Sequence, residues 1–576
     1  MTRITTLIIT LLIAINSIAT EKVNSNTVLY KGGTIVTMEG EAGETAEAVV
    51  SIDDKIVFVG TEEKAKALYP KAVEHDLEGK TMFPGFIEQH IHPFLGALTL
   101  VMDVIAPEPW DLPTKYWEPA YTPETYKEKL IQIEAEKEDP NEILMTWGYH
   151  HNFHGKIDRD YLDEISKDRP ILVWHRSVHE MYLNTAMIEH LGLTEQWVEG
   201  LNEQLKEQID FEKGYFIEAG LMLGLLPKIH HLMGSEERMR KGLDQMIKIL
   251  RKNGVTAFNE PGAFIMPGHH EIYMEMLGAE ETPMYSFFIP ESKTPYFRHA
   301  HEGPEAIVKA VEDITHSFPK EGKVRFFDKH VKLLIDGAIV SQLMMMEDGY
   351  LDGHEGEWIQ RPETISELFD IFWPLDYQLH VHVNGDKGMN ELLRVIERKM
   401  EEMPREDHRT TIVHFANSTN GQVERIQKLG CIVSANPYYV TAFSDKYSEV
   451  GLGPVRAQAM VRSGEAERRG IPFSLHSDLP IGPSDPLFLA WCAVTRGTLQ
   501  GNSYRPDLAL SLHGAMKGIT IEAAYSWRME NELGSIKEGK IANFTILEEN
   551  PYEVEESHLK DIKIWGTVFE GKCFQN

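Results

Sequence analysis

Short apolar runs alternate with helical segments through the middle of the chain. Eight of these runs have the length of strands and end in polar residues or turns. Residues 387–403 and 421–429 instead repeat apolar positions at helical spacing. Such alternation predicts a parallel α/β sheet or a (β/α)8 barrel. The predicted strands are residues 82–90, 254–259, 285–289, 331–335, 379–383, 411–415, 431–435 and 473–476.

The two ends of the chain share a different pattern of short strands and tight turns. Residues 21–84 and 533–576 therefore predict a composite β-sandwich domain, with the main domain at 85–532 inserted between its halves. Within the main domain, residues from about 110 to 234 exceed one β/α unit. This stretch predicts an insertion over the mouth of the barrel.

Residues 1–20 have the pattern of a secretory signal peptide. Arg3 supplies the positive charge, residues 7–15 form a short apolar run, and Ser17-Ile18-Ala19 offers small residues for cleavage. The apolar run is short for a membrane span. We expect a secreted or periplasmic protein, membrane-anchored if the signal stays uncleaved.

Composition narrows the classes of partner. The 576 residues carry a net charge of −32, which argues against nucleic acid and against an anionic membrane surface. We therefore expect no stable membrane association after signal cleavage. Three cysteines are too few for a disulfide framework in a chain of this length. A small-molecule substrate is the expected partner, and homo-oligomerisation stays open.

The run that begins at Met82 ends in His90-Ile91-His92. In a strand, residues i and i+2 point to the same side, so both imidazoles could bind one divalent metal. The same tripeptide is also compatible with two ordinary strand histidines. Further metal-ligand residue types at later strand ends favour the metal site.

Four later residues extend this pattern along the predicted barrel. Lys332, His382, His414 and Asp478 lie in or just after apolar strands, where barrel active sites form. Taken singly, Lys332 could be a surface lysine, the histidines core residues, and Asp478 a helix cap. Together, imidazole and carboxylate groups indicate zinc or a similar divalent ion, one or two per chain.

These motifs resemble the amidohydrolase superfamily, specifically amidohydrolase family 3, the YtcJ-like metal-dependent hydrolases. The resemblance extends over nearly the whole mature chain. It implies a distorted (β/α)8 TIM barrel, a composite β-sandwich from both termini and an insertion over the barrel mouth. The matching segments are residues 84–93, 184–186, 331–337, 382–386, 412–414, 477–480 and 534–544.

The resemblance also implies roles for these side chains. His90 and His92 would bind one metal, and His382 and His414 a second. Lys332, carboxylated by carbon dioxide, would bridge the two ions. Asp478 would bind metal and act as general base and acid.

Three positions depart from the family pattern. Glu88 and Gln89 stand where Asp and Ser or Thr are usual, which can alter the groups that orient the metal ligands. Asn543 stands in Ala542-Asn543-Phe544 where the family has Asp, far from the site.

The expected function is an exported metal-dependent hydrolase of a non-peptide carbon–nitrogen bond, in an amide, N-formyl or cyclic amide group. By the family pattern, His179 and Asn184 would bind substrate, although a capping role for Asn184 is equally compatible. We interpret His150, His151 and His154 as a surface cluster. The alternatives are an ester or lactone hydrolase, a deaminase or isomerase of the same fold, and a non-catalytic exported metal- or ligand-binding protein.

Overall fold

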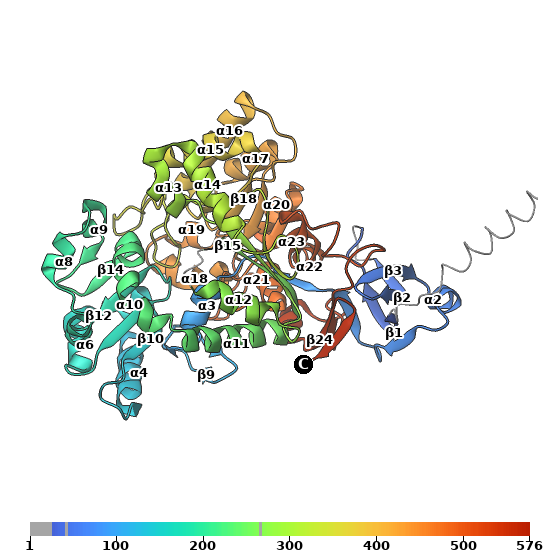
Figure 1. The fold of residues 1–576 in the computed structure, drawn as a ribbon, viewed down its shortest axis with the longest axis horizontal. Coiled ribbons are helices and arrows are strands. Elements are labelled where there is room, and N and C mark those ends of the chain that lie inside the picture. Colours follow the sequence, from blue (N-terminus) through green and yellow to red (C-terminus); the bar gives the residue numbers. More distant parts are fainter. Residues whose placement is uncertain (1–25, 41–43, 264–267) are drawn as a thin grey trace, which may run out of the picture.

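The computed structural model describes residues 26–40, 44–263 and 268–576 (Figure 1). The predicted signal peptide lies outside the described residues. In the described part of the chain, no helix has both the length and the apolar character needed to cross a membrane.

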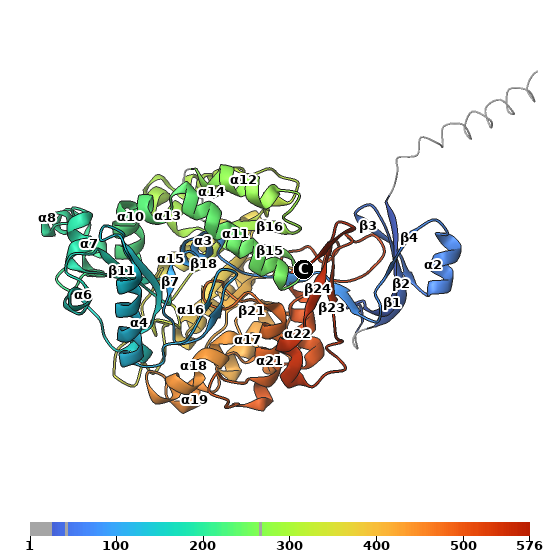
Figure 2. The same ribbon diagram turned by 90° about the horizontal axis from the view of Figure 1, so that it is seen from below.

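Two parallel sheets form the centre of this mixed α/β fold (Figures 1 and 2). On one side, the two sheets meet through an isolated parallel β-bridge between Glu291 and Lys332. On the other side, the Asp478 N–H donates a hydrogen bond to His90 O at 3.0 Å. The first sheet has the order β17 (Val324–Phe326), β16 (Tyr285–Pro290), β15 (Val255–Ala263) and β6 (Phe86–Glu88). The second runs β18 (His330–Leu334), β19 (Gln378–Val383), β20 (Thr411–His414), β21 (Ile432–Ala435) and β22 (Phe473–Leu475).

The strand predicted at 82–90 is in fact two strands. β5 (Thr81–Pro84) pairs with terminal strands, whereas β6 joins the central sheet. Gly85 lies at the crossing, where a Cβ would stand 2.0 Å from Thr256 Oγ1. Glycine at this position leaves room for the Thr256 side chain, which a Cβ would displace. His90 and His92 therefore follow β6 on a short loop.

Strands from both ends of the chain pair in one eight-stranded sheet, at the right of Figure 1. The antiparallel pairing of β5 with β23 joins the two ends. Residues 31–33 form an irregular part of β1, whose pairing with β2 shifts between Lys31 and Ile35. The strands are β1 (Thr27–Val36), β2 (Thr45–Ile52), β3 (Lys55–Gly60), β4 (Val73–Asp76), β5, β23 (Phe544–Leu547), β24 (Ile564–Phe569) and β25 (Lys572–Gln575).

The inserted region builds its own six-stranded sheet at the opposite end of the molecule (Figure 1). Its first strand begins at Asp103, ahead of the boundary expected near residue 110. The order is β13 (Ile209–Asp210), β14 (Tyr215–Ile217), β12 (Glu180–Leu183), β11 (Ile171–His175), β10 (Leu144–Tyr149) and β7 (Asp103–Val104).

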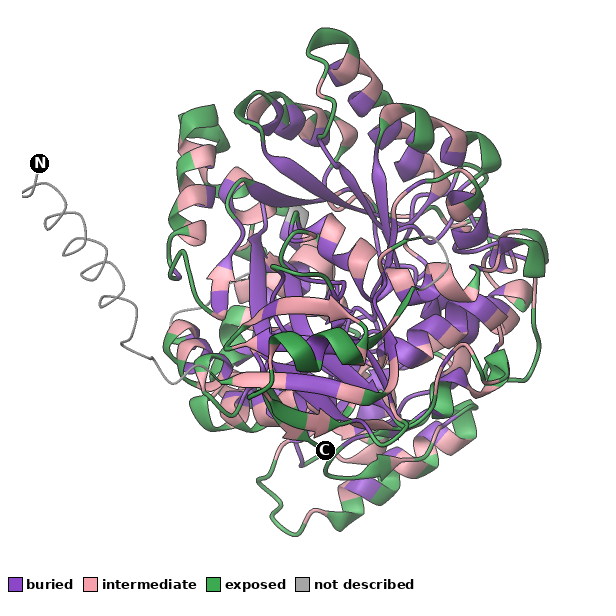
Figure 3. Cartoon of the chain, turned by 90° about the vertical axis from the view of Figure 1, so that its right-hand side faces the viewer, coloured by how far each residue is buried: buried purple, intermediate pink, exposed green. Residues whose placement is uncertain are grey.

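Helices surround the central strands, with buried faces inward and exposed faces in solvent (Figure 3). α17 begins with a reciprocal capping box between Thr419 and Gln422, and it ends at Gly430 in the left-handed conformation. The main helices are α3 (Pro93–Thr99), α11 (Glu236–Lys252), α14 (Pro304–Thr315), α15 (Pro362–Phe372), α16 (Asp386–Glu402), α17 (Asn420–Leu429), α18 (Tyr438–Glu449), α20 (Ser463–Arg468), α21 (Pro486–Thr495) and α22 (Leu512–Gly518).

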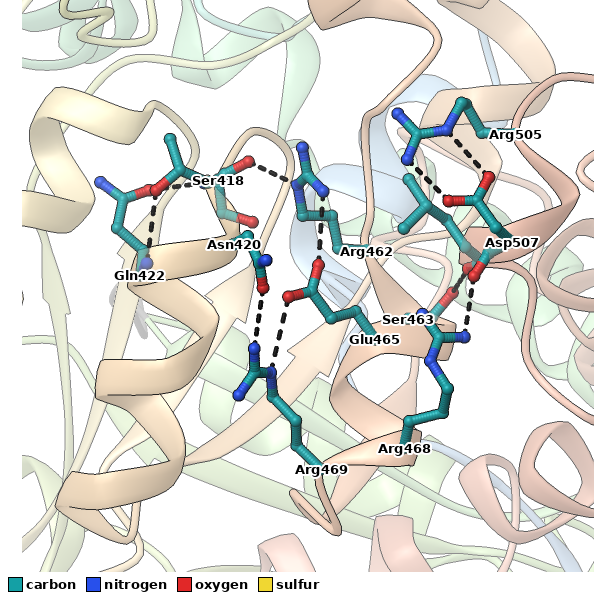
Figure 4. A network of polar contacts seen from close by, with 12 residues as sticks. Ser418, Asn420, Gln422, Arg462, Ser463, Glu465, Arg468, Arg469, Arg505 and Asp507 are labelled. Atoms are coloured by element: carbon teal, nitrogen blue, oxygen red, sulfur yellow. Dashed lines mark hydrogen bonds and ion pairs between the residues drawn. The ribbon is translucent and has the colours of Figure 1, made fainter.

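A polar network connects α17 and α20 on the outside of the barrel (Figure 4). Arg469 donates to Asn420 Oδ1 at 2.8 Å and pairs with Glu465 at 3.5 Å. Arg462 donates to Ser418 O at 2.7 Å. The network joins the loops that follow successive strands, although individual surface ion pairs stabilise by only about 0–1 kcal/mol.

Candidate metal centre

His90, His92 and Asp478 meet at the carboxyl ends of β6 and β22. His90 Nε2 lies 3.2 Å from His92 Nε2, and Asp478 Oδ1 lies 3.4 Å and 3.3 Å from these two atoms. His90 and Asp478 are buried, whereas His92 is partly exposed. Backbone hydrogen bonds fix the contact, because His90 O accepts from Asp478 N and Leu479 O accepts from His92 N.

The dimensions of this triangle fit a divalent ion. A tetrahedral zinc with ligand bonds of about 2.0–2.1 Å separates its ligand atoms by about 3.3–3.4 Å. In addition, Asp478 Oδ1 is buried with no hydrogen-bond donor among the described residues. A buried carboxylate oxygen without a donor is costly unless a cation compensates it. The residues present therefore fit the metal.

His414, at the end of β20, lies beside the triangle. Its Nδ1 is 3.6 Å from Asp478 Oδ2, 3.2 Å from Tyr439 Oη and 3.3 Å from His476 Nε2. The ligand atoms of His90, His414 and His476 come within 4.8 Å of one another. The sequence interpretation did not single out His476, although its i, i+2 spacing from Asp478 repeats that of His90 and His92.

Lys332 and His382 lie in the same interior. Lys332 is 2% exposed, its Nζ has no hydrogen-bond partner among the described residues, and burial lowers its pKa to about 7. The His382 ring lies 4.4 Å from the His414 ring, but its Nε2 faces Asn384 Nδ2 at 3.0 Å. His382 therefore packs on the cluster without sharing the triangle, and its predicted metal-binding role stays a prediction.

Two buried glutamates contact the residues of the triangle or their neighbours in the chain. Glu260 on β15 lies 3.5 Å from His92 Nδ1; burial opposes the charge of His92, but Asp478 and Glu260 outweigh it and raise its pKa to about 9. Glu88 accepts from Ser477 N at 2.9 Å and Ser484 Oγ at 2.8 Å. Glu88, one of the departures from the family pattern, thus fixes the backbone next to Asp478.

The insertion supports the same loop through Arg176, which follows β11. Arg176 is fully buried and donates to Pro480 O and Ile481 O at 2.9 and 2.5 Å. Its Nε donates to Glu108 Oε1 at 2.5 Å. The guanidinium lies over the rings of Trp110 and Trp147, at 5.1 and 4.6 Å. Sequence reasoning could not find this contact, because its partners are backbone atoms some 300 residues away.

The two substrate-binding candidates differ in their surroundings. His179 Nδ1 pairs with Glu218 Oε2 at 2.9 Å. Burial lowers the pKa of His179, but the larger opposing effect of Glu218 and a smaller one of Asp478 raise this pKa overall. His179 thus lies within electrostatic reach of the centre. Asn184 caps helix α7 (Thr185–His190), and its amide also contacts Ile171 N, Ser166 O and Arg169 O. This fully used amide gives a substrate-binding role no support.

The prediction of a surface cluster at His150, His151 and His154 is wrong. His150 and His154 are buried, and His151 is half-buried. Together with His175 on β11, they form an insertion cluster, in which His150, His151 and His175 bring ligand atoms within 4.8 Å. Four of its eight ring nitrogens face backbone groups, such as the Ala120 carbonyl that lies 2.7 Å from His154 Nε2, whereas His175 Nε2 has no partner among the described residues.

Comparison with known proteins places this geometry in a family. Residues 73–575 match the family model described as Amidohydrolase family. The chain belongs to the amidohydrolase family. As a member of this family, the chain is an enzyme of the amidohydrolase class, whose members hydrolyse carbon–nitrogen bonds. The expected family resemblance and enzyme class are confirmed.

Similar proteins span nearly its full length. The protein YtcJ of Bacillus subtilis (strain 168) is 25% identical and covers 94% of this chain and 98% of its own. An N-substituted formamide deformylase of Arthrobacter pascens is 23% identical, over 91% of this chain and 94% of its own. A metal-dependent hydrolase of Pyrococcus horikoshii OT3, itself uncharacterized, is 20% identical with a TM-score of 0.68, over 92% and 99% of the two chains. That likeness establishes the shared fold.

Proposed function

We propose that this amidohydrolase uses one or two zinc ions to hydrolyse an N-substituted amide or formamide outside the cytoplasm. The triangle of His90, His92 and Asp478 carries the proposal, because its edges of 3.2–3.4 Å match those of a bound ion. The named activity of the Arthrobacter pascens relative supports the bond type. The sequence of residues 1–20 supports export.

Within this proposal, His90 and His92 hold the ion and Asp478 has two roles. When bound, the metal lowers the pKa of water and polarises a carbonyl oxygen. Asp478 takes the proton from the attacking water as the new carbon–oxygen bond forms. The same carboxyl then gives that proton to the departing nitrogen as the carbon–nitrogen bond breaks. Glu88 and Arg176 keep Asp478 in place through the backbone on either side of it.

The pair His179–Glu218 belongs to the insertion and would bind a polar group of the substrate. His179 is only 19% exposed at its side chain, and Glu218 12%. A charged pair at this depth favours a substrate with a carbonyl or carboxylate that accepts from the imidazole.

Lys332 is the candidate bridge between two ions. Its buried amine has a pKa of about 7, so much of it is neutral at neutral pH and able to form a carbamate with carbon dioxide. The carbamate would supply a second carboxylate-like ligand beside His414. Without that modification, the proposal reduces to a single ion.

The test combines metal content with turnover. Purified full-length protein and a Lys332→Ala variant would be analysed by plasma mass spectrometry, then assayed on N-substituted formamides, other amides and matched esters. We expect one or two zinc ions per wild-type chain, fewer in the variant, and formamide or amide turnover that a chelator abolishes and zinc restores. Absence of metal from wild-type protein, or turnover confined to esters, would contradict the proposal.

A further inference from the structure

His476 lies in the metal centre but has no role in the proposed mechanism. It follows β22, is fully buried, and its ring lies 4.6 Å from that of His90 and 5.3 Å from that of His414. The distance of 3.3 Å between His476 Nε2 and His414 Nδ1 is also that expected between two ligands of one tetrahedral ion, about 3.3–3.4 Å.

A relay of hydrogen bonds decides which nitrogen of His476 carries the proton. Ser526 Oγ donates its only proton to Ala523 O at 2.7 Å, so it accepts from Gln89 Nε2 at 3.0 Å. The Gln89 amide is thereby oriented with Oε1 toward Ser434 Oγ, which donates to it. The reversed amide would place Oε1 against a hydroxyl that has no proton left.

The last link of the relay concerns the imidazole itself. Ser434 Oγ lies 2.8 Å from His476 Nδ1, but its proton is already given to Gln89. His476 Nδ1 must therefore be the donor in this contact. The neutral ring then has its lone pair on Nε2, which faces His414.

We infer that His476 is a further ligand of the metal centre, binding the ion through Nε2 next to His90 and His414. Ser434, Gln89 and Ser526 are positioning residues that select this tautomer and orientation. A metal-binding histidine usually donates its other ring N–H to a fixed acceptor, which is the arrangement found here. Gln89, a departure from the family pattern, thereby helps to fix the tautomer of His476 through Ser434. The inference rests on the proposed metal-dependent function.

The experiment measures metal binding to full-length protein without any substrate. Wild type, His476→Asn and Ser434→Ala would be stripped of metal, titrated with Co²⁺, and followed by visible absorption and by competition with a chelator. Asparagine keeps an N–H near the position of Nδ1 but removes Nε2. We expect His476→Asn to weaken binding by at least about 100-fold and change the absorption, and Ser434→Ala to weaken it about 10–100-fold.

A matched control comes from the insertion cluster. His175 is equally buried, and its Nδ1 also lies 2.8 Å from a serine hydroxyl, that of Ser177. His175→Asn should leave the Co²⁺ affinity and absorption of the centre unchanged. Loss of the same ion in this control would overturn the inference.

Other outcomes separate the inference from the proposed function. Wild-type affinity and absorption in His476→Asn would overturn the ligand role alone. Wild-type protein that binds no Co²⁺ would overturn the metal-dependent function and this inference together. Circular dichroism would establish folding, and Ser434→Ala tests the relay independently if His476→Asn does not fold.

Discussion

Among the described residues, two buried histidine clusters differ in the groups that their ring nitrogens face. In the metal centre, His90 and His92 face each other and share the carboxylate of Asp478. In the insertion cluster, His154 Nδ1 accepts from His150 N and its Nε2 faces Ala120 O. The insertion group whose ligand atoms converge consists of histidines, and the carboxylate of Glu180 lies 3.5 Å from His175 Nδ1.

Convergence of imidazoles alone is therefore weaker support for a metal site than convergence of imidazoles with a carboxylate. A ring nitrogen used by the backbone has no lone pair to offer an ion. In the centre, the ring nitrogens face side chains and an acid oxygen without a donor, so an ion bound there would compensate several groups at once. The backbone contacts of the insertion cluster instead fix the loop that carries it.

The largest expected effect is on Asp478. Asp478→Asn removes both the general base and a charged ligand, so kcat/KM should fall by about 10³-fold or more, with loss of bound metal. Initial rates on a formamide or amide that the wild-type enzyme hydrolyses would measure kcat/KM, and metal analysis would measure the bound ions. A variant with full metal content and near-normal turnover would remove Asp478 from the mechanism.

Arg176 connects the two regions, and its loss should affect stability first. Arg176→Met leaves the buried carboxylate of Glu108 unpaired, which destabilises by about 3–5 kcal/mol. Urea unfolding would measure the loss. The double variant Arg176→Met with Glu108→Leu should recover part of the stability but not kcat, because the carbonyls of Pro480 and Ile481 still lack their donor. Full recovery of kcat would limit Arg176 to a stabilising role.

The insertion cluster should make the fold sensitive to acid. Burial lowers the pKa of His154 from 6.5 to about 4, so the unfolded chain binds a proton before the folded one. The contribution of His154 to the free energy of unfolding is therefore fully present above pH 6.5. About 3 kcal/mol of it is lost as the pH falls toward 4. Unfolding free energies between pH 7 and 4 should fall less steeply in His154→Gln. Equal slopes would show that other groups control the acid response.

The smallest effect is expected at His151, the half-buried member of the insertion cluster. His151→Ala should leave metal content unchanged and lower the melting temperature only slightly. Plasma mass spectrometry and thermal unfolding would check both values. Loss of one ion per chain would show that the insertion cluster is itself a metal site, and the contrast between the two clusters would then fail.

Sequence pattern predicted most strands of the two central sheets, because each buried strand is a local apolar run, but it missed β17. It also singled out His90, His92, His414 and Asp478, which the structure brings together, while their roles stay predictions. It failed at the strand predicted for 82–90, where the split into two sheets depends on the contact of Gly85 with Thr256. It also failed for the buried histidines of the insertion, whose surroundings are supplied by residues distant in the chain.

The kinds of ligand and their local spacing, such as His90 with His92 at i, i+2, can be read from the amino-acid sequence. Which nitrogen atoms are free to bind depends on contacts that form only in the folded chain. The tautomer of His476 depends on Ser434, Gln89 and Ser526, from three separate parts of the chain. Spacing along a strand is a local property, whereas the proton of an imidazole goes to whatever acceptor the fold places beside it.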